Sequence, residues 1–445
     1  MSLLTVVKKR VEFLPEWVGR PLSNVPFALR LGPEYVEAQR SIACVERMGC
    51  PAAMDRTLQQ LKGLVRFAVD NVEFYRTFYR DKGFSPIEVQ TLADWDRVPV
   101  ITKADLQGVP LEARTARGAT GVKINTGGTS GQPLEFYQDS HAFAREWAHM
   151  HFIWKAHGYR PQHLKLTFRG KHFDPAHVLR YNAVHNEYVV NANAPMEAVV
   201  RAVMSLPRRT VIRWLHGYPS LIAEFAHAVA GLSDMERAAF RARLFGALLG
   251  SEYPVPMYRT VIEDVLTANV VSWYGHSEMA VLARETAKGV YESLPTYGFT
   301  EAVPAGPGSD CRLVCTSLHN RVHPFIRYDT GDLVEPVSRC SGSLAFRITE
   351  GRVGDFIHDR QGRRHSLTAV IFGRHHAAFE LVQHLQVREE ASGVVTLVVT
   401  PRNPEIDEAS LCKGFDLDDL DIEWRFQVVV SPVRTQAGKI RLKIS

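Results

Sequence analysis

Strand-like and helical runs alternate from about Leu164 to Asp332, and this alternation limits the possible folds more than any other feature of the sequence. Such alternation is typical of a parallel sheet flanked by helices, so we expect an α/β protein. Four short apolar runs have the character of strands, and one run between them has a helical period: Lys165 to Phe168, Thr210 to Leu215, Ala247 to Leu249, Val270 to Trp273, and the helical Ser220 to Ala230.

The regions before and after this alternation have a different character. Apolar residues recur with a helical period from Leu58 to Val72, and a second helix is expected between Asp139 and Gly158. After Gly351, strand-like runs such as Val394 to Thr400 predict a small α+β domain. We expect a large N-terminal domain (1–350) with mixed sheets flanked by helices, a hinge (351–355) and a small mobile α+β C-terminal domain (356–445).

Composition narrows the class of protein. The chain has 445 residues, is 45% hydrophobic and carries a net charge of +5 without long basic runs, which argues against a nucleic-acid surface. No segment approaches the length of a membrane span, and the N-terminus lacks the charge order of a secretory signal. We expect a cytoplasmic protein, as a monomer or a homodimer. The sparse cysteines form no CxxC pair and are expected to be reduced; a zinc site at Cys311, Cys315 and Cys340 is the alternative.

The segment from Asn125 to Leu134, NTGGTSGQPL, joins two strand-like runs and is rich in glycine and hydroxyl groups. Glycine lets backbone N–H groups approach an anion closely, and Thr126, Thr129 and Ser130 add side-chain donors. The segment is not a common P-loop, because Gln132 and Pro133 follow the last glycine where that motif has Lys and Ser or Thr. It predicts a phosphate-binding loop, with a simple turn as the alternative.

Five further motifs follow this loop in order. Gly250-Ser251-Glu252 follows an apolar strand, at the end where open α/β sheets bind ligands. The motif from Trp273 to Glu278 offers aromatic faces for a base and a carboxylate able to hold Mg²⁺. Ile326 to Asp332 places a carboxylate after a tight turn, suited to both hydroxyls of a ribose. Gly351 to Asp355 supplies an arginine at the hinge, and Gly438 to Arg441 supplies a lysine in a glycine turn.

With these motifs in this order, the sequence resembles the adenylate-forming (AMP-forming) ligase superfamily. Within it, the chain is most similar to the phenylacetate-CoA ligase-like branch, which includes capsule-biosynthesis ligase-like proteins. The resemblance covers most of the chain and also includes Leu92 to Leu106 (LADWDRVPVITKADL) and His216 to Ser220 (HGYPS). It implies the fold of these ligases and the use of ATP and Mg²⁺, with CoA as a possible co-substrate.

The resemblance also implies roles for particular residues. The catalytic residues would be Lys439, Glu278 and Arg352, with Glu278 holding the metal. The acid would lie near His216, Tyr218, Gly275 and His276 in an aromatic pocket that Trp147 could complete, and the branch favours an aryl or arylacetic acid. The nucleotide would contact a larger set: Thr126, Gly127, Gly128, Thr129, Ser130, Gly131, Ser251, Glu252, Tyr274, Gly275, Ser277, Asp332 and Arg352.

The implied reaction is attack of a carboxylate on the α-phosphate of ATP, with loss of pyrophosphate and formation of an acyl-adenylate. Lys439 would stabilise the charge that develops during this transfer, which is electrostatic catalysis. The acyl group would then pass to CoA, to a carrier-protein thiol, or to an amine or hydroxyl.

Three departures leave alternatives open. Gln132 stands where relatives often carry a lysine, and Gly354 replaces the first of two hinge acids. The segment HDRQGRRHS after the hinge resembles the capsule-type subgroup more than the glycine-rich loop of CoA ligases. The alternatives are an acyl-AMP ligase that forms an amide or ester in polysaccharide or natural-product biosynthesis, and a catalytically silent nucleotide- or acyl-binding relative.

Overall fold

The computed structural model divides into two compact units. The first contains Met1–Arg30, Trp154–Ser272 and Asp355–Ser445, and the second contains Leu31–Ile153 and Trp273–Gly354. The predicted hinge at 351–355 lies outside the described residues. The structure describes residues 14–125, 134–171, 173–174, 176–192, 194–250, 252, 254–267, 269–306, 311–350, 356–367, 370–371, 376–415, 417, 420–434 and 440–444.

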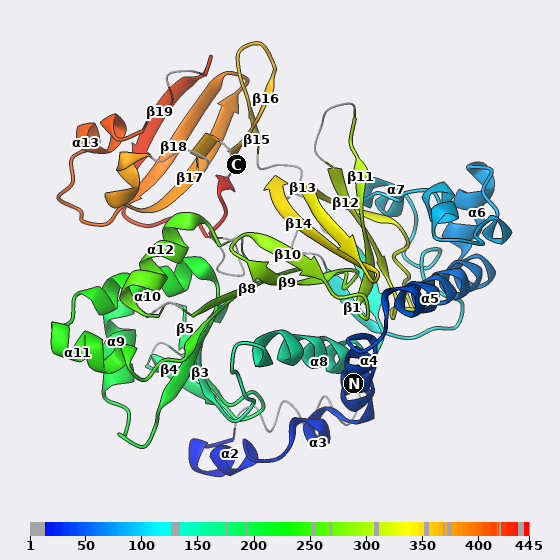
Figure 1. Cartoon of the computed structure of the whole chain (residues 1–445). Helices are drawn as coiled ribbons and strands as arrows, with labels where there is room; N and C mark the ends of the chain where they lie inside the picture. The colour runs from blue at the N-terminus through cyan, green and yellow to red at the C-terminus, as the bar shows by residue number, and fades with distance from the viewer. Residues whose placement is uncertain are drawn as a thin grey trace. The chain divides into compact units, whose positions relative to one another are not determined.

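The first unit is built on a mostly parallel sheet in the order β8-β7-β6-β3-β5-β4 (Figure 1), in which only β4 and β5 pair antiparallel. The order reverses at β3, because the chain continues to β5 on one side of β3 and then to β6 on the other. This reversal is the topological switch point of the sheet. The strands are β3 (Leu164–Lys171), β4 (Leu179–Asn182), β5 (Glu187–Asn191), β6 (Ile212–Gly217), β7 (Gly246–Leu249) and β8 (Val270–Gly275).

Strand β3 shows why this sheet has two different faces. Its residues Leu164, Leu166 and Phe168 point to one face and belong to a buried apolar cluster with the covering helices. Lys165, Thr167 and Arg169 alternate with them and point to the other face. Apolar residues of four helices are part of the cluster: α9 (Met196–Met204), α10 (Pro219–Ala230), α11 (Asp234–Arg241) and α12 (Pro256–Val265). Two further helices, α2 (Glu16–Leu22) and α3 (Phe27–Leu31), come earlier in the chain.

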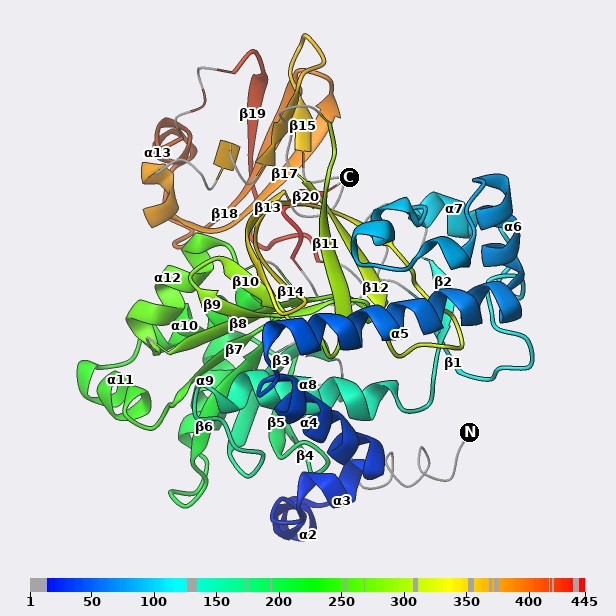
Figure 2. The same cartoon turned by 45° about the vertical axis from the view of Figure 1, so that its right-hand side comes forward.

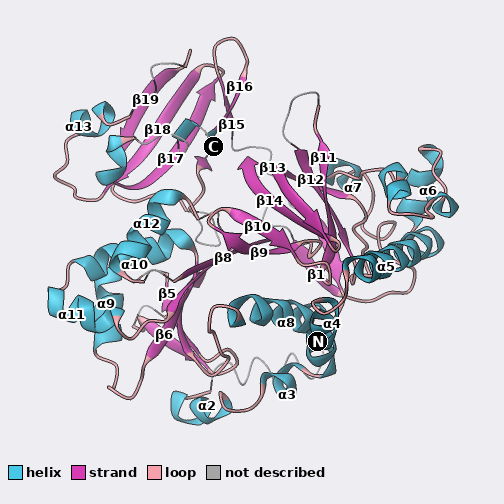
Figure 3. Ribbon diagram, viewed as in Figure 1, coloured by secondary structure: helices cyan, strands magenta, loops and turns pink. Residues whose placement is uncertain are grey.

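The last part of the first unit confirms the predicted small α+β fold. Four strands form a sheet in the order β19-β18-β17-β20, and β15 and β16 form a separate hairpin. Figure 3 shows the strands of this part with the short helix α13 beside them. The elements are β15 (Phe356–His358), β16 (Arg364–Ser366), η4 (Ala377–Glu380), β17 (Val382–Ala391), β18 (Val394–Pro401), α13 (Glu408–Lys413), β19 (Glu423–Val428) and β20 (Lys443–Ile444).

The second unit combines helices with antiparallel strands. Its strands run in the order β11-β12-β13-β14-β10-β9-β8, and every neighbouring pair is antiparallel. The elements are α4 (Pro33–Val45), α5 (Cys50–Asn71), α6 (Glu73–Asp81), η1 (Pro86–Glu88), η2 (Ala93–Arg97), α7 (Lys103–Gln107), β1 (Val122–Asn125), β2 (Glu135–Gln138), α8 (Ala142–Lys155), β9 (Leu282–Ala287), β10 (Val290–Ser293), β11 (Gly298–Pro304), β12 (Cys311–Ser317), β13 (Tyr328–Cys340) and β14 (Ser343–Glu350).

Helix α5 contributes to the buried apolar cluster of the second unit. Figure 2 shows this long helix crossing the ends of β11 and β12, and its Leu61 and Leu64 belong to one buried cluster with Phe299 and Phe346. The helical period from Leu58 to Val72 therefore predicted a real helix, although α5 begins earlier, at Cys50. The expected helix after Asp139 is also confirmed, as α8.

The tight turn expected before Asp332 is a bulge inside a strand. Strand β13 starts at Tyr328 and continues past Asp332, and its pairing register with β12 shifts between Arg312 and Val314. Gly331 has a φ of 80°, which glycine adopts without the steric cost of a side chain. The sequence indicated a change of direction here, and a bulge supplies it without ending the strand.

Among the described helices, none is long and apolar enough to cross a membrane.

Candidate functional site

Two hydrogen bonds in the second unit join the motifs around Tyr274 and Asp332. Tyr274, near the end of β8, donates its hydroxyl to Oδ2 of Asp332 in β13. Tyr328, at the start of β13, donates its hydroxyl to Oε1 of Glu278 at 3.3 Å. These bonds join residues that are 58 and 50 positions apart in the sequence, so two distant segments present their carboxylates from one place in the fold.

The turn after β8 holds Glu278 in a polar but buried position. Nδ1 of His276 lies 2.9 Å from Oε2 of Glu278, and both side chains are buried. Gln138, at the end of β2, donates from Nε2 to the carbonyl oxygen of Ser277 at 2.7 Å. Because β1 and β2 flank the predicted phosphate loop, this bond connects that hairpin to the turn. Gly275 is exposed, and an added Cβ would lie 3.0 Å from the Leu282 side chain.

The donor set at Glu278 limits what kind of metal site is possible. Within the described ranges, no group of three or more His, Cys, Asp or Glu side chains could hold a metal ion. Mg²⁺ is commonly bound by one or two carboxylates together with substrate phosphates and water. Glu278 therefore fits the single-carboxylate part of such a site, and a phosphate-bearing substrate would have to supply further oxygens.

In the first unit, the carboxyl ends of three adjacent parallel strands meet at the switch point. Phe168 of β3 pairs with Gly217 of β6, and Gly217 pairs with Leu249 of β7. The backbone at Gly217 has a φ of 135°, and a Cβ there would lie 1.9 Å from the carbonyl oxygen of Phe168. Only glycine fits this close approach. The next residues along the chain, Arg169 and Tyr218, therefore emerge beside each other.

Glu252 receives two kinds of contact at this edge. Its Oε2 accepts from the hydroxyl of Ser220 at 2.8 Å, near the start of α10. Its Oε1 accepts from the backbone N–H of Ile440 at 3.0 Å. Ile440 is the residue that follows Lys439 in the sequence, so the C-terminal segment reaches a residue predicted to bind the nucleotide.

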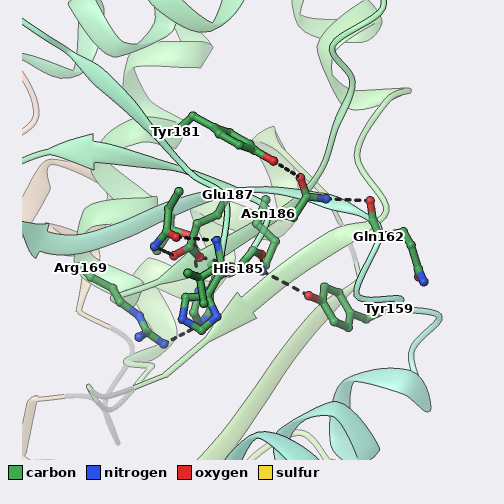
Figure 4. Close-up of polar contacts among 12 residues, drawn as sticks. Tyr159, Gln162, Arg169, Tyr181, His185, Asn186 and Glu187 are labelled. Atoms are coloured by element: carbon green, nitrogen blue, oxygen red, sulfur yellow. Dashed lines mark hydrogen bonds and ion pairs between the residues drawn. The ribbon is translucent and has the colours of Figure 1, made fainter. Parts of the chain in front are cut away.

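His216 lies in a set of polar contacts that sequence analysis did not identify. The imidazole is 1% exposed; its Nε2 accepts from Arg169 at 2.9 Å, and its Nδ1 lies 3.5 Å from the Thr167 hydroxyl. Lys165 and Glu187 continue the set (Figure 4). A signal was present: Lys165, Thr167 and Arg169 alternate with apolar residues, which indicates a polar strand face.

Several predicted site residues belong to parts of the chain outside the described residues. Of the predicted acid-site residues, His216 and Tyr218 belong to the first unit, and Gly275 and His276 belong to the second. Tyr218 is buried at the switch point. The roles of nine site residues stay predictions, because these residues lie outside the described ranges: Thr126, Gly127, Gly128, Thr129, Ser130, Gly131, Ser251, Arg352 and Lys439.

The buried His384 of β17 contacts side chains of two helices of the first unit, α10 and α12. His384 of β17 lies 2.9 Å from the Tyr258 hydroxyl through Nδ1 and 2.9 Å from Oε1 of Glu224 through Nε2. Arg434 also contacts Glu224. Burial alone would raise the pKa of Glu224, but His384 and Arg434 outweigh it, so that the pKa is lowered.

We expect this lowered pKa to appear as pH-dependent stability. The Glu224 contribution is present above the carboxyl pKa of the unfolded chain, about 4.3, and is lost as the pH falls through the lower pKa of the folded state. Glu224→Gln should therefore cost about 2–3 kcal/mol at pH 7. The difference in thermal unfolding between the variant and the parent should be full at pH 7 and should shrink as the pH falls below about 4.3. A difference that does not change with pH would contradict the assignment.

Comparison with known proteins agrees with this geometry. No protein-family model matches the sequence. Protein CapK of Staphylococcus aureus is 22% identical over 313 residues, which are 68% of this chain and 68% of that protein. A crystal structure of 2-hydroxyisobutyryl-CoA ligase in the postadenylation state, in complex with R3-HIB-AMP, has a TM-score of 0.63 at 20% identity and covers 89% of this chain and 90% of its own.

A second type of ligase has a related structure. The GH3.15 acyl acid amido synthetase has a TM-score of 0.56 at 12% identity, with 84% of this chain and 86% of its own covered. The chain therefore has the fold of the adenylate-forming ligases. This confirms the predicted fold class, an α/β protein with mixed sheets flanked by helices and a small α+β C-terminal part.

Proposed function

We propose that this protein activates a carboxylic acid with ATP, releases pyrophosphate and forms an acyl-adenylate, and then transfers the acyl group to an acceptor. The observation that carries this proposal is the pair of hydrogen bonds that joins Tyr274 to Asp332 and Tyr328 to Glu278. They bring together a tyrosine ring suited to a base, a carboxylate suited to a ribose, and a carboxylate suited to Mg²⁺.

The remaining roles follow the sequence motifs. The phosphates of ATP would lie on the loop from Thr126 to Gly131, and Ser251, Glu252, Gly275 and Ser277 would surround the adenosine with Tyr274. Arg352 would assist Asp332 at the ribose. Lys439 would stabilise the charge that develops on the carboxylate and α-phosphate oxygens. The contact between Glu252 and Ile440 supports this role, because it ties the segment after Lys439 to the predicted nucleotide site.

The acceptor defines two versions of the proposal. One structural neighbour is a CoA ligase that has been solved with 2-HIB-AMP and CoA, and another is an amido synthetase. Transfer to CoA makes this protein an acid-thiol ligase that acts on an aromatic acid, the substrate class that the resemblance to the phenylacetate-CoA ligase-like branch implies. Transfer to an amine or hydroxyl makes it an acid-amine or ester-forming ligase, which the charged HDRQGRRHS segment favours.

Acid-dependent exchange of labelled pyrophosphate into ATP tests the activation step itself. A panel of aryl, arylacetic, hydroxy and fatty acids should include at least one that supports exchange, and hydroxylamine should trap its acyl group. Adding CoA or amines to the active acid then identifies the acceptor. If folded, ATP-binding protein shows no exchange with any acid, a catalytically silent relative replaces the ligase proposal.

Asp332→Ala should weaken ATP binding roughly 10- to 100-fold, because a buried carboxylate that holds two ribose hydroxyls contributes through charge-assisted hydrogen bonds. Titration calorimetry with ATP measures this directly. Asp332→Asn keeps the shape and should give a smaller loss. Unchanged ATP affinity in Asp332→Ala, with the fold intact by circular dichroism, would remove Asp332 from the nucleotide site.

A further inference from the structure

Arg169 lies at the switch point of the parallel sheet, and the buried imidazole of His216 binds its guanidinium. Because a guanidinium can only donate hydrogen bonds, Nε2 of His216 must accept the 2.9 Å bond from Arg169. The ring proton is then on Nδ1, which faces the hydroxyl of Thr167 at 3.5 Å. His216 is therefore a neutral imidazole in a fixed tautomer.

The contacts continue into the sheet and fix the direction of this chain of hydrogen bonds. Thr167 donates its hydroxyl to Oε2 of Glu187 at 2.8 Å, and Asn182 donates to Oε1 at 3.3 Å. Lys165 lies 3.9 Å from Glu187 and donates to the His185 carbonyl oxygen at 2.6 Å. Figure 4 shows Arg169 at one side of this network and Glu187 within it. A buried carboxylate thus orients Thr167, Thr167 orients His216, and His216 orients Arg169.

The charges of the buried part of the network compensate each other, but the charge of Arg169 at its exposed end is not compensated. Lys165 and Glu187 compensate each other in the interior. Arg169 is exposed, and among the described residues no carboxylate lies within ion-pair distance of it. Burial, together with the positive charges of Arg169 and Lys165, holds the pKa of His216 well below its usual range, so the ring remains an acceptor at neutral pH. A cation held by His216 therefore lies at the switch point of the sheet.

The position of this cation matches the place where such sheets bind ligands. Arg169 lies in the last part of β3, next to the residue that pairs with the carboxyl end of β6, where the strand order reverses. Both Arg169 and Glu252 act on Tyr218: burial raises the pKa of its phenol, Glu252 raises it further, and Arg169 opposes this. The three side chains therefore share one neighbourhood, which includes residues already assigned to the nucleotide and the acid.

We propose that Arg169 recognises a second anionic group on the acid substrate, such as a second carboxylate or a phosphate, and that His216 is the residue that positions it. This inference rests on the proposed ligase function and specifies its substrate class: the acid carries two acidic groups, one that is activated and one that is bound by the guanidinium. A planar guanidinium matches both carboxylate and phosphate oxygens in a bidentate arrangement.

Matched acids test the substrate class by pyrophosphate exchange. Each dicarboxylic acid, aliphatic or aromatic, is compared with its half-amide, and phosphate-bearing acids form a separate arm. The parent protein should favour the second anionic group by roughly 10- to 100-fold in kcat/KM, the effect of one charge-assisted pair. In Arg169→Gln this preference should disappear through a higher KM with kcat within about twofold, because the contact binds substrate and transition state alike.

Arg213→Gln is the matched control. Arg213 lies near the amino end of β6, donates to the Arg243 carbonyl oxygen and packs on Phe245, so its loss removes the same charge from the same sheet away from the switch point. The preference for diacids should survive in this variant. Equal kcat/KM for diacids and half-amides in the parent, or an unchanged preference in Arg169→Gln, overturns the inference.

His216 variants test positioning. His216→Leu removes the acceptor and should raise the KM for the diacid several-fold, whereas His216→Asn offers an oxygen to Arg169 and an N–H to Thr167 and should restore most of the affinity. Equal KM values for the two variants, at equal thermal stability, would show that His216 does not position Arg169.

Direct binding separates this inference from the proposed function. Calorimetry of dicarboxylates and inorganic phosphate with the ATP-loaded protein needs no turnover. Absence of exchange with every acid, together with dicarboxylate binding that depends on Arg169, refutes the ligase and keeps the anion site. Exchange with monocarboxylic acids, together with diacid binding that is unaffected by Arg169→Gln, keeps the ligase and refutes the anion site.

Discussion

Replacing Lys439 with alanine is expected to lower the rate of acyl-adenylate formation by at least two to three orders of magnitude, the range that follows the loss of a group that stabilises transition-state charge. ATP affinity should stay within a few-fold, because the lysine acts mainly in the transition state rather than on the bound nucleotide. Pyrophosphate exchange measures the first quantity and ATP calorimetry the second.

Lys413→Ala is the control for this prediction. Lys413 is exposed in the last turn of α13, in the same C-terminal part of the chain, and its loss should leave exchange unchanged. A Lys439→Ala protein with the parental exchange rate would remove Lys439 from the reaction. A large loss of ATP affinity would instead make it a ground-state nucleotide contact.

Glu301→Gln is expected to produce the largest loss of stability, about 3–5 kcal/mol, because the buried Arg327 guanidinium loses its buried charge partner. The remaining carboxylate, that of Asp96, lies 3.8 Å away and is exposed. Nη2 of Arg327 lies 3.0 Å from Oε1 of Glu301, and both side chains are buried. Arg327 also donates to the carbonyl oxygens of Asp96 and Val98, and the indole of Trp95 donates to Glu301 at 2.9 Å. One ion pair thus ties β11 and the start of β13 to the segment around Trp95.

The cost of burying this pair suggests a second, diagnostic variant. Burial raises the pKa of Glu301, although Arg327 and Trp95 act in the opposite direction. A pair that is expensive to bury can be replaced as a whole at a lower cost than either half. The double variant Glu301→Leu, Arg327→Met should therefore recover part of the stability that Glu301→Gln loses. A double variant less stable than the single one would show that the backbone contacts of Arg327 dominate.

An exposed ion pair in the same unit provides the comparison. Glu335 and Arg347 lie 3.3 Å apart on β13 and β14, and both are more than half exposed. Glu335→Gln should cost no more than about 1 kcal/mol. Urea unfolding of the parent and the variants measures both effects, and equal losses for Glu301→Gln and Glu335→Gln would show that burial of the first pair does not matter.

Local patterns in the sequence were sufficient for the elements around the site. The apolar runs at Ala247 and Val270 became β7 and β8, and the helical run at Ser220 became α10, because the period of burial is set within each segment. The end of β3 was placed at Phe168, too early. Arg169 and Lys171 look like loop residues, but Lys171 still pairs with Asn191 of β5.

Partners distant in the sequence could not be predicted in the same way. Asp329 is the nearest carboxylate to Arg327 in the sequence, but in the structure Arg327 pairs with Glu301 and Asp329 contacts Arg312. The contact of Glu224 with His384 likewise depends on how two segments pack. The composition of one segment does not determine such contacts, because they depend on the register of strands and helices brought together only in the folded chain.

The even positions of β3 point to one face of the sheet and are constrained by packing. The odd positions point to the other face, where Arg169 is available for a substrate. The even positions, Leu164, Leu166 and Phe168, maintain the fold through the apolar cluster. Arg169 lies on the opposite face, at the switch point of the sheet. A substitution there leaves the packing contacts of the even positions in place. A change of substrate range can therefore evolve, or be engineered, at this odd position without a compensating change in the core, so one scaffold can diversify its chemistry while its folding requirements stay constant.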